Sequence, residues 1–264
     1  LSVSYERIGD TLVDDGDYDA GLETYAKALA IREELAALDP GNTLRQRDLS
    51  VTFERVGDIN SLRGDPDSAL LAHQAALAIR ERLAALDPTN MQWQRDLSVS
   101  HERVGDLYSD QNDLVAAMAA QERSLGLRQG IVALDPENLA RQRDLGIALE
   151  KIADLREAMG DLDGAMAAQD ETLRLRQAMV AADPGVVQYQ RDLGFSLLKV
   201  GGLYLAQGDP AAAEPFLAEA VALRQRLAGA APDSAQALYD LAVAANLHAQ
   251  TLLDLGRNSE ALVV

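Results

Sequence analysis

The sequence predicts an all-α protein, an α-solenoid in which antiparallel helix pairs stack into a superhelical array. Three observations predict this fold: a repeat 48 residues long, helix-start and helix-stop residues at fixed places in it, and an apolar stripe with helical spacing. The segment LSVSYERIGD at 1–10 returns as LSVTFERVGD at 49–58 and again at 97–106, then more loosely from Leu145, Leu193 and Leu241. We therefore expect a single array of about five and a half units, with boundaries near 1–41, 42–89, 90–137, 138–185, 186–233 and 234–264.

Polar caps and helix breakers predict two helices in each unit. The first helix is expected to begin after Asn42, Asn90, Asn138 and Ser234, with Val186 as the exception among these capping positions. It is expected to end at a residue that tolerates left-handed backbone, and the aspartate that follows caps the second helix. The second helix ends before an Asp-Pro pair, because proline blocks its continuation. The left-handed positions are Gly64, Asn112, Gly160, Gly208 and Gly256, and the capping aspartates are Asp17, Asp65, Asp113, Asp161 and Asp209.

The second helix of each unit carries one continuous apolar stripe. Its members alternate at steps of three and four residues, which is the spacing of one helix face. A single helix pair cannot bury such a stripe on both sides, so neighbouring units must stack. The stripe is Ala69, Ala72, Ala76, Ile79, Leu83 and Leu86 in one unit, Gly21, Thr24, Ala28, Ile31, Leu35 and Leu38 in another, and Ala213, Phe216, Ala220, Leu223, Leu227 and Ala230 in a third.

Composition excludes several classes of partner. The formal net charge of −18 repels phosphate backbones, so no nucleic acid is expected. No apolar run approaches the about 20 residues that span a bilayer, so no membrane partner is expected and a cytoplasmic location is favoured. Both ends of the sequence fall inside predicted helices, which indicates a piece of a longer protein. We expect apolar edges there, and end-to-end self-association through them, at Leu252, Leu255, Leu262 and Val263.

No residue pattern in the sequence predicts chemistry. Cysteine is absent, and the three histidines lie in different units without metal-ligand spacing. The glycines are single and periodic, so they form no phosphate-binding loop. We therefore expect no enzyme activity, no catalytic residue, no metal and no cofactor. The histidines are His73, His101 and His248.

A pattern of residue types recurs in the first helices. An aromatic or apolar residue is followed by an apolar residue three positions on and then by glycine, as in Tyr5-Ile8-Gly9. This pattern resembles the tetratricopeptide repeat (TPR), a helix–turn–helix unit of about 34 residues, and the likeness covers the whole chain. Because the unit here is about 14 residues longer, we interpret it as a long-helix bacterial variant. The pattern recurs at Phe53-Val56-Gly57, His101-Val104-Gly105 and Leu197-Val200-Gly201, with the alanine of the second helix at Ala69, Ala117, Ala165, Ala213 and Ala261.

The resemblance implies that the first helices line a concave groove, and that ligands meet two positions four residues apart on each helix. Carboxylates occupy both positions in four units, and an apolar residue takes the first position in the fifth. Arginines lie two turns earlier on the same face. The candidate groove residues are Glu6, Asp10, Glu54, Asp58, Glu102, Asp106, Glu150, Asp154 and Leu198, with Arg47, Arg95, Arg143 and Arg191 beside them.

Two interpretations of this charged ladder stay open. It is either a binding surface, for which a basic partner is expected, or a structural network that fixes the stacking of the units. On the structural interpretation, the basic residue after each glutamate reaches a carboxylate of the adjacent unit; these are Arg7, Arg55, Arg103 and Lys151. A further set on the second helices is expected to flank the core with buried stems, namely Arg32, Arg80, Arg128, Arg176 and Arg224.

The function expected from this fold is that of a protein–protein interaction scaffold. Its concave groove would bind a peptide, a disordered segment or a neighbouring domain. The alternative is a regulatory or sensor region that controls an enzymatic effector domain outside these residues.

Overall fold

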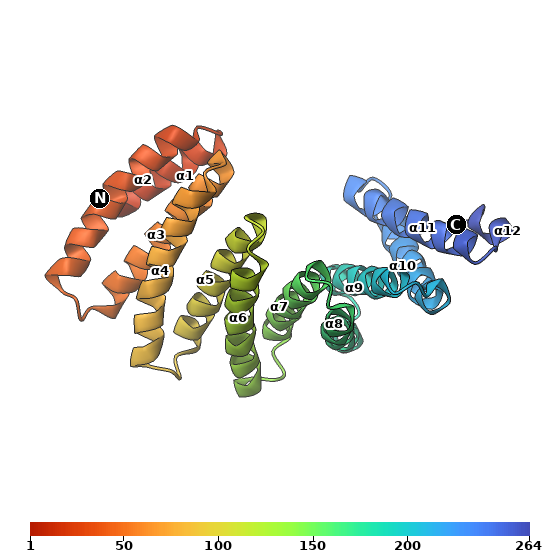
Figure 1. Cartoon of the computed structure of the whole chain (residues 1–264). Helices are drawn as coiled ribbons and strands as arrows, with labels where there is room; N and C mark the ends of the chain where they lie inside the picture. Colours follow the sequence, from red (N-terminus) through yellow and green to blue (C-terminus); the bar gives the residue numbers. More distant parts are fainter. The chain divides into compact units, whose positions relative to one another are not determined.

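A computed structural model describes residues 1–264, and they form twelve α-helices and no strands (Figure 1). Two compact units divide the chain, Leu1–Leu134 and Asp135–Val264. Within each unit, consecutive helices pack against one another, which confirms the predicted all-α fold of paired helices. The first unit contains α1 (Ser2–Asp14), α2 (Tyr18–Leu38), α3 (Thr43–Arg63), α4 (Pro66–Leu86), α5 (Met91–Asp110) and α6 (Leu114–Leu134). The second contains α7 (Leu139–Ala158), α8 (Leu162–Ala182), α9 (Val187–Ala206), α10 (Pro210–Ala230), α11 (Ala235–Asp254) and α12 (Asn258–Ala261).

The division between the compact units lies three residues before a boundary expected between repeats, at 137/138. Each unit by itself repeats the predicted alternation of a first helix and a second helix. The first helices are α1, α3, α5, α7, α9 and α11, and the second helices are the even-numbered ones. A single array over the whole chain stays a prediction.

The predicted caps set the helix boundaries. The Asn42 side chain accepts a hydrogen bond from the Arg45 amide at 3.1 Å, whereas Val186 makes no side-chain cap at the start of α9. Gly64 adopts the left-handed conformation that ends α3, with φ of 80°. Asn112 has φ of 59° and is the one residue other than glycine with positive φ. The start and stop positions read from the sequence are therefore confirmed.

The apolar stripe of the second helices is buried except at its end. Ala69 and Ala76 are inaccessible or nearly so, but Leu86 is 70 % exposed, and Leu38 and Ala230 are exposed as well. The stripe therefore stays accessible in the last turn of the second helix. An open hollow of about 610 Å³ lies between the end of α4 and the loop that contains Pro40, so nothing covers Leu86 there.

A close approach between the two helices of a pair explains the recurring glycine. A Cβ atom built on Gly57 would lie 2.6 Å from the His73 ring, and one on Gly201 would lie 2.5 Å from Leu217 Cδ2. The facing residue on the second helix is almost completely buried in both pairs. The first helix can therefore reach the second only where its side chain is absent or very small.

Two adjacent glycines of α9 test this packing. Gly201→Ala should lower the free energy of unfolding by about 1–3 kcal/mol, because the new methyl overlaps the fully buried Leu217 side chain. Gly202→Ala meets nothing within 4 Å and should raise the free energy of unfolding by about 0.5–1 kcal/mol, through helix propensity alone. Chemical denaturation of both variants measures the difference. Equal effects of the two substitutions would show that the helices are not in close contact at Gly201.

The structure also describes the predicted apolar edge at the carboxyl end and the apolar character of the helices. Leu262 and Val263 are exposed as expected, but Leu252 is buried, because α11 packs against both α10 and α12. No helix is both long enough and apolar enough to cross a lipid bilayer.

Candidate protein-binding face of the first helices

Buried arginines of the second helices hold the glutamates of the predicted groove. The Arg32 guanidinium lies 2.7 Å from Glu6, and the same pairing, 26 residues apart, joins Arg80 to Glu54. It recurs between Arg128 and Glu102 and between Arg176 and Glu150. The four glutamate side chains are only about one-fifth exposed. These carboxylates therefore face into their own repeat.

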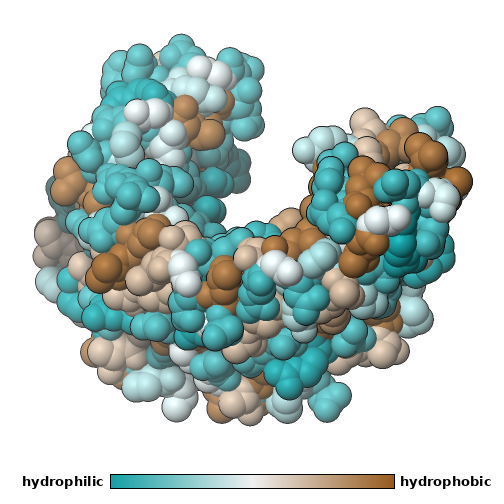
Figure 2. Space-filling view, turned by 45° about the vertical axis from the view of Figure 1, so that its right-hand side comes forward, coloured by the Kyte–Doolittle hydropathy of each residue, from teal (hydrophilic) through white to brown (hydrophobic).

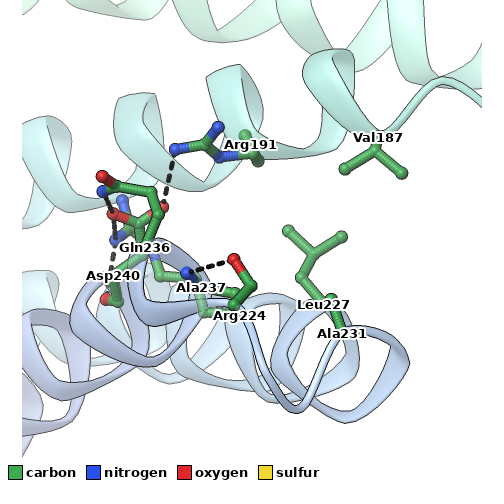
Figure 3. A pocket seen from close by; sticks show the side chains of 9 residues that line it. Val187, Arg191, Arg224, Leu227, Ala231, Gln236, Ala237 and Asp240 are labelled. Carbon is green, nitrogen blue, oxygen red and sulfur yellow. Dashed lines mark hydrogen bonds and ion pairs between the residues drawn. The ribbon is translucent and has the colours of Figure 1, made fainter.

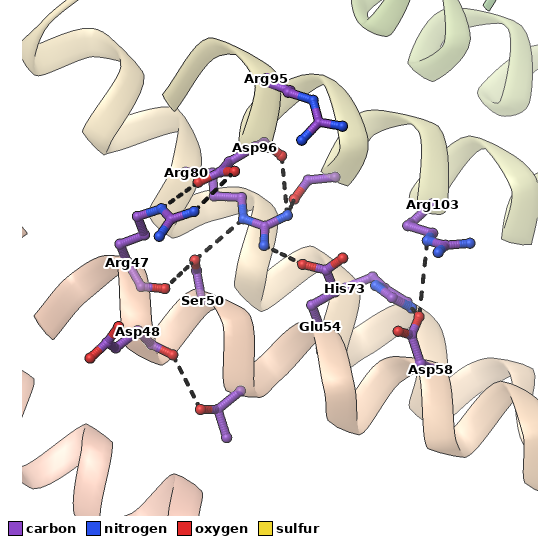
Figure 4. Close-up of polar contacts among 12 residues, drawn as sticks. Arg47, Asp48, Ser50, Glu54, Asp58, His73, Arg80, Arg95, Asp96 and Arg103 are labelled. Carbon is purple, nitrogen blue, oxygen red and sulfur yellow. Dashed lines mark hydrogen bonds and ion pairs between the residues drawn. The ribbon is translucent and has the colours of Figure 1, made fainter. Parts of the chain in front are cut away.

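The arginine of the Arg80–Glu54 pair also reaches the next repeat (Figure 4). Arg80 is 3 % exposed and donates to Ser50 Oγ on α3, at 3.3 Å. It also donates to the Asp96 carbonyl at 3.1 Å and to Ser100 Oγ at 2.9 Å, both on α5. The expectation for these arginines was a buried stem, but the charged guanidinium is buried too. Because one guanidinium on α4 binds both α3 and α5, it fixes how one repeat stacks on the next.

The basic stripe of the first helices is paired as well. Arg47 Nε lies 2.6 Å from Asp96 of the next repeat, and this hydrogen bond raises the pKa of Arg47 above its ordinary value. In the second unit Arg143 makes the same contact with Asp192 at 2.6 Å. Arg191 reaches Asp240 at 3.2 Å. Arg95 also has a partner.

The aspartates of the groove meet polar side chains of the second helices. Asp10 accepts a hydrogen bond from the Tyr25 hydroxyl, and Asp106 accepts one from Gln121 Nε2 at 2.9 Å. Asp58 lies 3.6 Å from His73 Nε2, and burial raises the pKa of Asp58 and lowers that of His73.

The basic residue after the groove glutamate reaches the neighbouring repeat in the same region. Arg103 Nε lies 4.0 Å from Asp58, so the expected link to a carboxylate of the adjacent repeat is present for Arg103. Lys199, which follows Leu198 in place of a glutamate, makes the same kind of contact, with its Nζ 2.7 Å from Asp154. All the carboxylates and arginines of the predicted groove thus make contacts within the chain.

Leu198, the apolar member of the predicted groove, is half-buried. It packs on a core cluster that includes Leu197, Val200 and Leu223. Its position belongs to the core more than to the surface.

A different column of side chains is accessible on the first helices. One apolar residue on each helix, three positions before the groove glutamate or its equivalent, points outward or is half-buried. These residues were not predicted as a set, although their recurrence every 48 residues is visible in the sequence. We call it the apolar column: Val3, Val51 and Val99 in the first unit, and Ile147, Phe195 and Val243 in the second.

The column adds accessible apolar side chains to the side of the first helices that also carries the charged ladder. In the view of Figure 2 the surface is largely hydrophilic, with apolar residues in separate small areas. Phe195 is 39 % exposed, a large share for an aromatic side chain. Its ring lies 5.6 Å from Lys199 Nζ and 6.0 Å from Arg176 Cζ, distances typical of cation–π contacts.

A hollow surrounds Phe195 in the second unit. It has a volume of about 320 Å³, and side chains of α7, α8, α9, α10 and α11 line it. Ile147 and Phe195 supply the apolar part of its wall, and Arg176 and Arg191 supply charge. This arrangement can hold an apolar side chain of a partner beside a polar one. No group of three or more histidine, aspartate or glutamate side chains is placed to hold a metal ion.

The stacked helix pairs and their recurring glycines define a helical-repeat protein, and comparison with known proteins gives the family. Residues 3–35 and 196–236 each match a model described as tetratricopeptide repeat. These two segments are therefore tetratricopeptide repeats. No curated protein matches the sequence.

Solved structures share the fold at low sequence identity. BtubC (BKLC) from P. vanneervenii is 16 % identical with a TM-score of 0.68, and the match covers 93 % of this chain and 87 % of that one. A putative kinesin light chain with TPR-like repeats from Podosopora anserina is 13 % identical with a TM-score of 0.57, covering 85 % and 95 %. A STAND protein with a TPR sensor from Pyrococcus horikoshii is 11 % identical with a TM-score of 0.60, covering 98 % of this chain and 36 % of that one.

Proposed function

We propose that the chain is a protein-interaction scaffold that binds an extended peptide segment of a partner along the first-helix face, with the apolar column as its main contact. The repeat fold supports the general role of a protein–protein interaction scaffold. The observation that carries the finer proposal is the contrast on one face. The charged ladder is paired within the chain, while Phe195 and Val243 remain accessible.

Apolar contacts explain specificity at this face better than the carboxylates do. A surface ion pair contributes only about 0–1 kcal/mol, and the groove glutamates would have to leave a buried arginine to meet a basic partner. Exposed aromatic and aliphatic side chains, by contrast, gain free energy by leaving water and are typical of the centres of protein interfaces. The expectation of a basic partner rested on those carboxylates, so we propose a partner segment chosen mainly by its apolar residues.

Selection from a random-peptide library, followed by methyl spectra of the chain, tests this proposal. A selected peptide should shift the methyl signals of Val51, Ile147 or Val243, which lie on first helices. It should leave unchanged the signals of Leu71 and Val115, which are exposed on second helices and serve as matched controls. Shifts confined to Leu71 and Val115, or no selected peptide at all, would contradict the proposal.

The alternative role, a regulatory or sensor region, would use the same face. If the bound segment belonged to a neighbouring domain, its release would carry the signal to that domain. One similar structure is of a STAND protein with a TPR sensor, where the match spans 36 % of that chain. End-to-end association through Leu262 and Val263 stays a prediction.

A further inference from the structure

The second-helix arginine of the fifth repeat lacks the partners of its counterparts. Arg224 is 6 % exposed, as deeply buried as Arg176 in the preceding repeat. Leu198 stands where the four earlier repeats have glutamate, and Ala244 stands where Ser196 accepts a hydrogen bond from Arg176. Arg224 makes one hydrogen bond, to the Asp240 carbonyl at 2.7 Å, and its distance to the Asp240 carboxylate is 3.8 Å.

A guanidinium carries five N–H donors, but Arg224 makes only one hydrogen bond within the chain. Most of its donors therefore have no acceptor in the protein. A buried charge without a hydrogen-bonded counter-ion is unfavourable, because the guanidinium has lost its hydration. Burial accordingly lowers the pKa of Arg224. In the fourth repeat, by contrast, Arg176 donates to the Asp192 carbonyl, to Ser196 and to Glu150.

The fifth repeat also has fewer carboxylates to pair with its arginines than the fourth repeat has. Arg191 and Arg224 share the single carboxylate of Asp240. In the preceding repeat the equivalent arginines, Arg143 and Arg176, have a carboxylate each. One positive charge in the fifth repeat is therefore left without a carboxylate of its own, in a chain whose net charge is −18.

A pocket opens beside these two arginines (Figure 3). It has a volume of about 140 Å³, well above the roughly 10–15 Å³ that one water molecule needs. Val187 on α9 and Leu227 on α10 form an apolar wall, and Arg191 and Arg224 lie with Asp240 at the polar end. The hollow at Phe195 shares Arg191, Arg224 and Asp240 with this pocket, so the two adjoin.

We propose that this pocket binds one acidic side chain of the peptide partner, with the methylene stem on Val187 and Leu227 and the carboxylate on Arg224 and Arg191. The inference rests on the proposed function, because the acidic side chain comes from the peptide bound along the same helices. Pairs of arginine and carboxylate are among the strongest hydrogen bonds in proteins. The net charge of −18 disfavours a strongly acidic peptide, so the segment carries a single acidic residue among apolar ones.

A titration with a single-residue probe tests the pocket without the partner. N-acetyl-glutamate N-methylamide should shift the Arg224 Nε–Hε signal in a ¹⁵N-correlated spectrum, and the glutamine analogue should bind at least tenfold more weakly. Leu198→Glu places a resident carboxylate where the four earlier repeats have one, so it should weaken binding of the probe at least tenfold. Leu198→Gln is the matched neutral control and should retain binding. A melting curve of each variant confirms that it is folded.

A gain of binding in another repeat supplies the second test. Glu150→Leu should give Arg176 the same deficit and create a second site for the glutamate probe, seen at the Arg176 Nε–Hε signal. Equal binding of the two probes, or Leu198→Glu binding as well as Leu198→Gln, would overturn the carboxylate pocket. Those results would leave the proposed function standing if library peptides still shift the methyls of the apolar column. Failure to select any peptide would contradict the proposed function. The probe titration would still show whether the pocket binds a carboxylate.

Discussion

Replacing Arg80 with alanine should lower the free energy of unfolding by about 3–5 kcal/mol, the largest effect expected from any single substitution in this chain. The change removes a buried guanidinium that binds Ser50, Glu54 and Ser100 on two neighbouring helices. It also leaves the largely buried Glu54 carboxylate without a counter-ion. Denaturant unfolding, followed by circular dichroism, measures the loss.

Two further variants separate the charge from its surroundings. Lys27→Ala breaks the fully exposed Lys27–Glu23 pair and should produce no measurable change. Arg80→Met combined with Glu54→Leu removes both charges of the buried pair and should recover most of the lost stability, since the desolvation cost disappears with the ions. If Arg80→Ala were no worse than Lys27→Ala, the buried arginines would not hold the repeats together.

Acidification should destabilise the chain through His101. This ring is buried on α5, and burial, with a smaller contribution from Arg123, lowers its pKa to about 4. The ordinary value is about 6.5, so the unfolded chain binds the proton more readily than the folded chain between those two values. Stability conferred by the neutral ring is therefore complete above about pH 6.5 and is lost as the pH falls toward 4, by roughly 2–3 kcal/mol.

His101→Leu isolates this contribution. Leu149 and Leu197 occupy the equivalent position in later repeats and are buried there, so leucine fits the site. The free energy of unfolding of the variant should depend less on pH between 4 and 6.5 than that of the native chain, and the two chains should respond alike above pH 7. Parallel curves over the whole range would show that His101 is not a buried neutral group.

Local signals account for what the sequence predicted correctly. Asn42 and Gly64 set the ends of α3 through contacts within a few residues of themselves. The glycine at position 57 needs one partner, His73, in the same helix pair. The residues that make these contacts all lie within one repeat. The helix boundaries and the pairing of the two helices could therefore be predicted from the sequence.

The roles of the charged residues depended on contacts that no local pattern contains. Glu54 occupies a place that the TPR resemblance assigns to the groove, but Arg80 lies 26 residues later, within the last two turns of α4. Arg80 places a cation against Glu54, and the glutamate becomes part of the repeat interface. Arg47 and Asp96 lie 49 residues apart, on two first helices that come together only when the repeats stack.

The exposure of the apolar column could not be predicted, because its residues resemble core residues. Val51 and Phe195 look like core residues in the sequence, because a recurring apolar residue is usually buried. Only the stacked helices show that this side of each first helix has no neighbour covering it. The sequence shows that Leu198 replaces the glutamate of the earlier repeats. That this replacement deprives Arg224 of a carboxylate follows only from the structure, in which Arg176 pairs with Glu150.

The central claim is that the charged ladder stabilises the stack while the apolar column binds the partner. The most direct measurement determines peptide affinity and melting temperature together on two variants, Phe195→Ser and the pair Glu54→Gln with Glu102→Gln. A peptide that shifts the methyls of the second unit should bind Phe195→Ser at least tenfold more weakly, with the melting temperature nearly unchanged. The glutamine variant should melt at a lower temperature and, while folded, bind the peptide with native affinity. The reverse result, a stable glutamine variant that no longer binds and a Phe195→Ser variant that binds normally, would contradict the account.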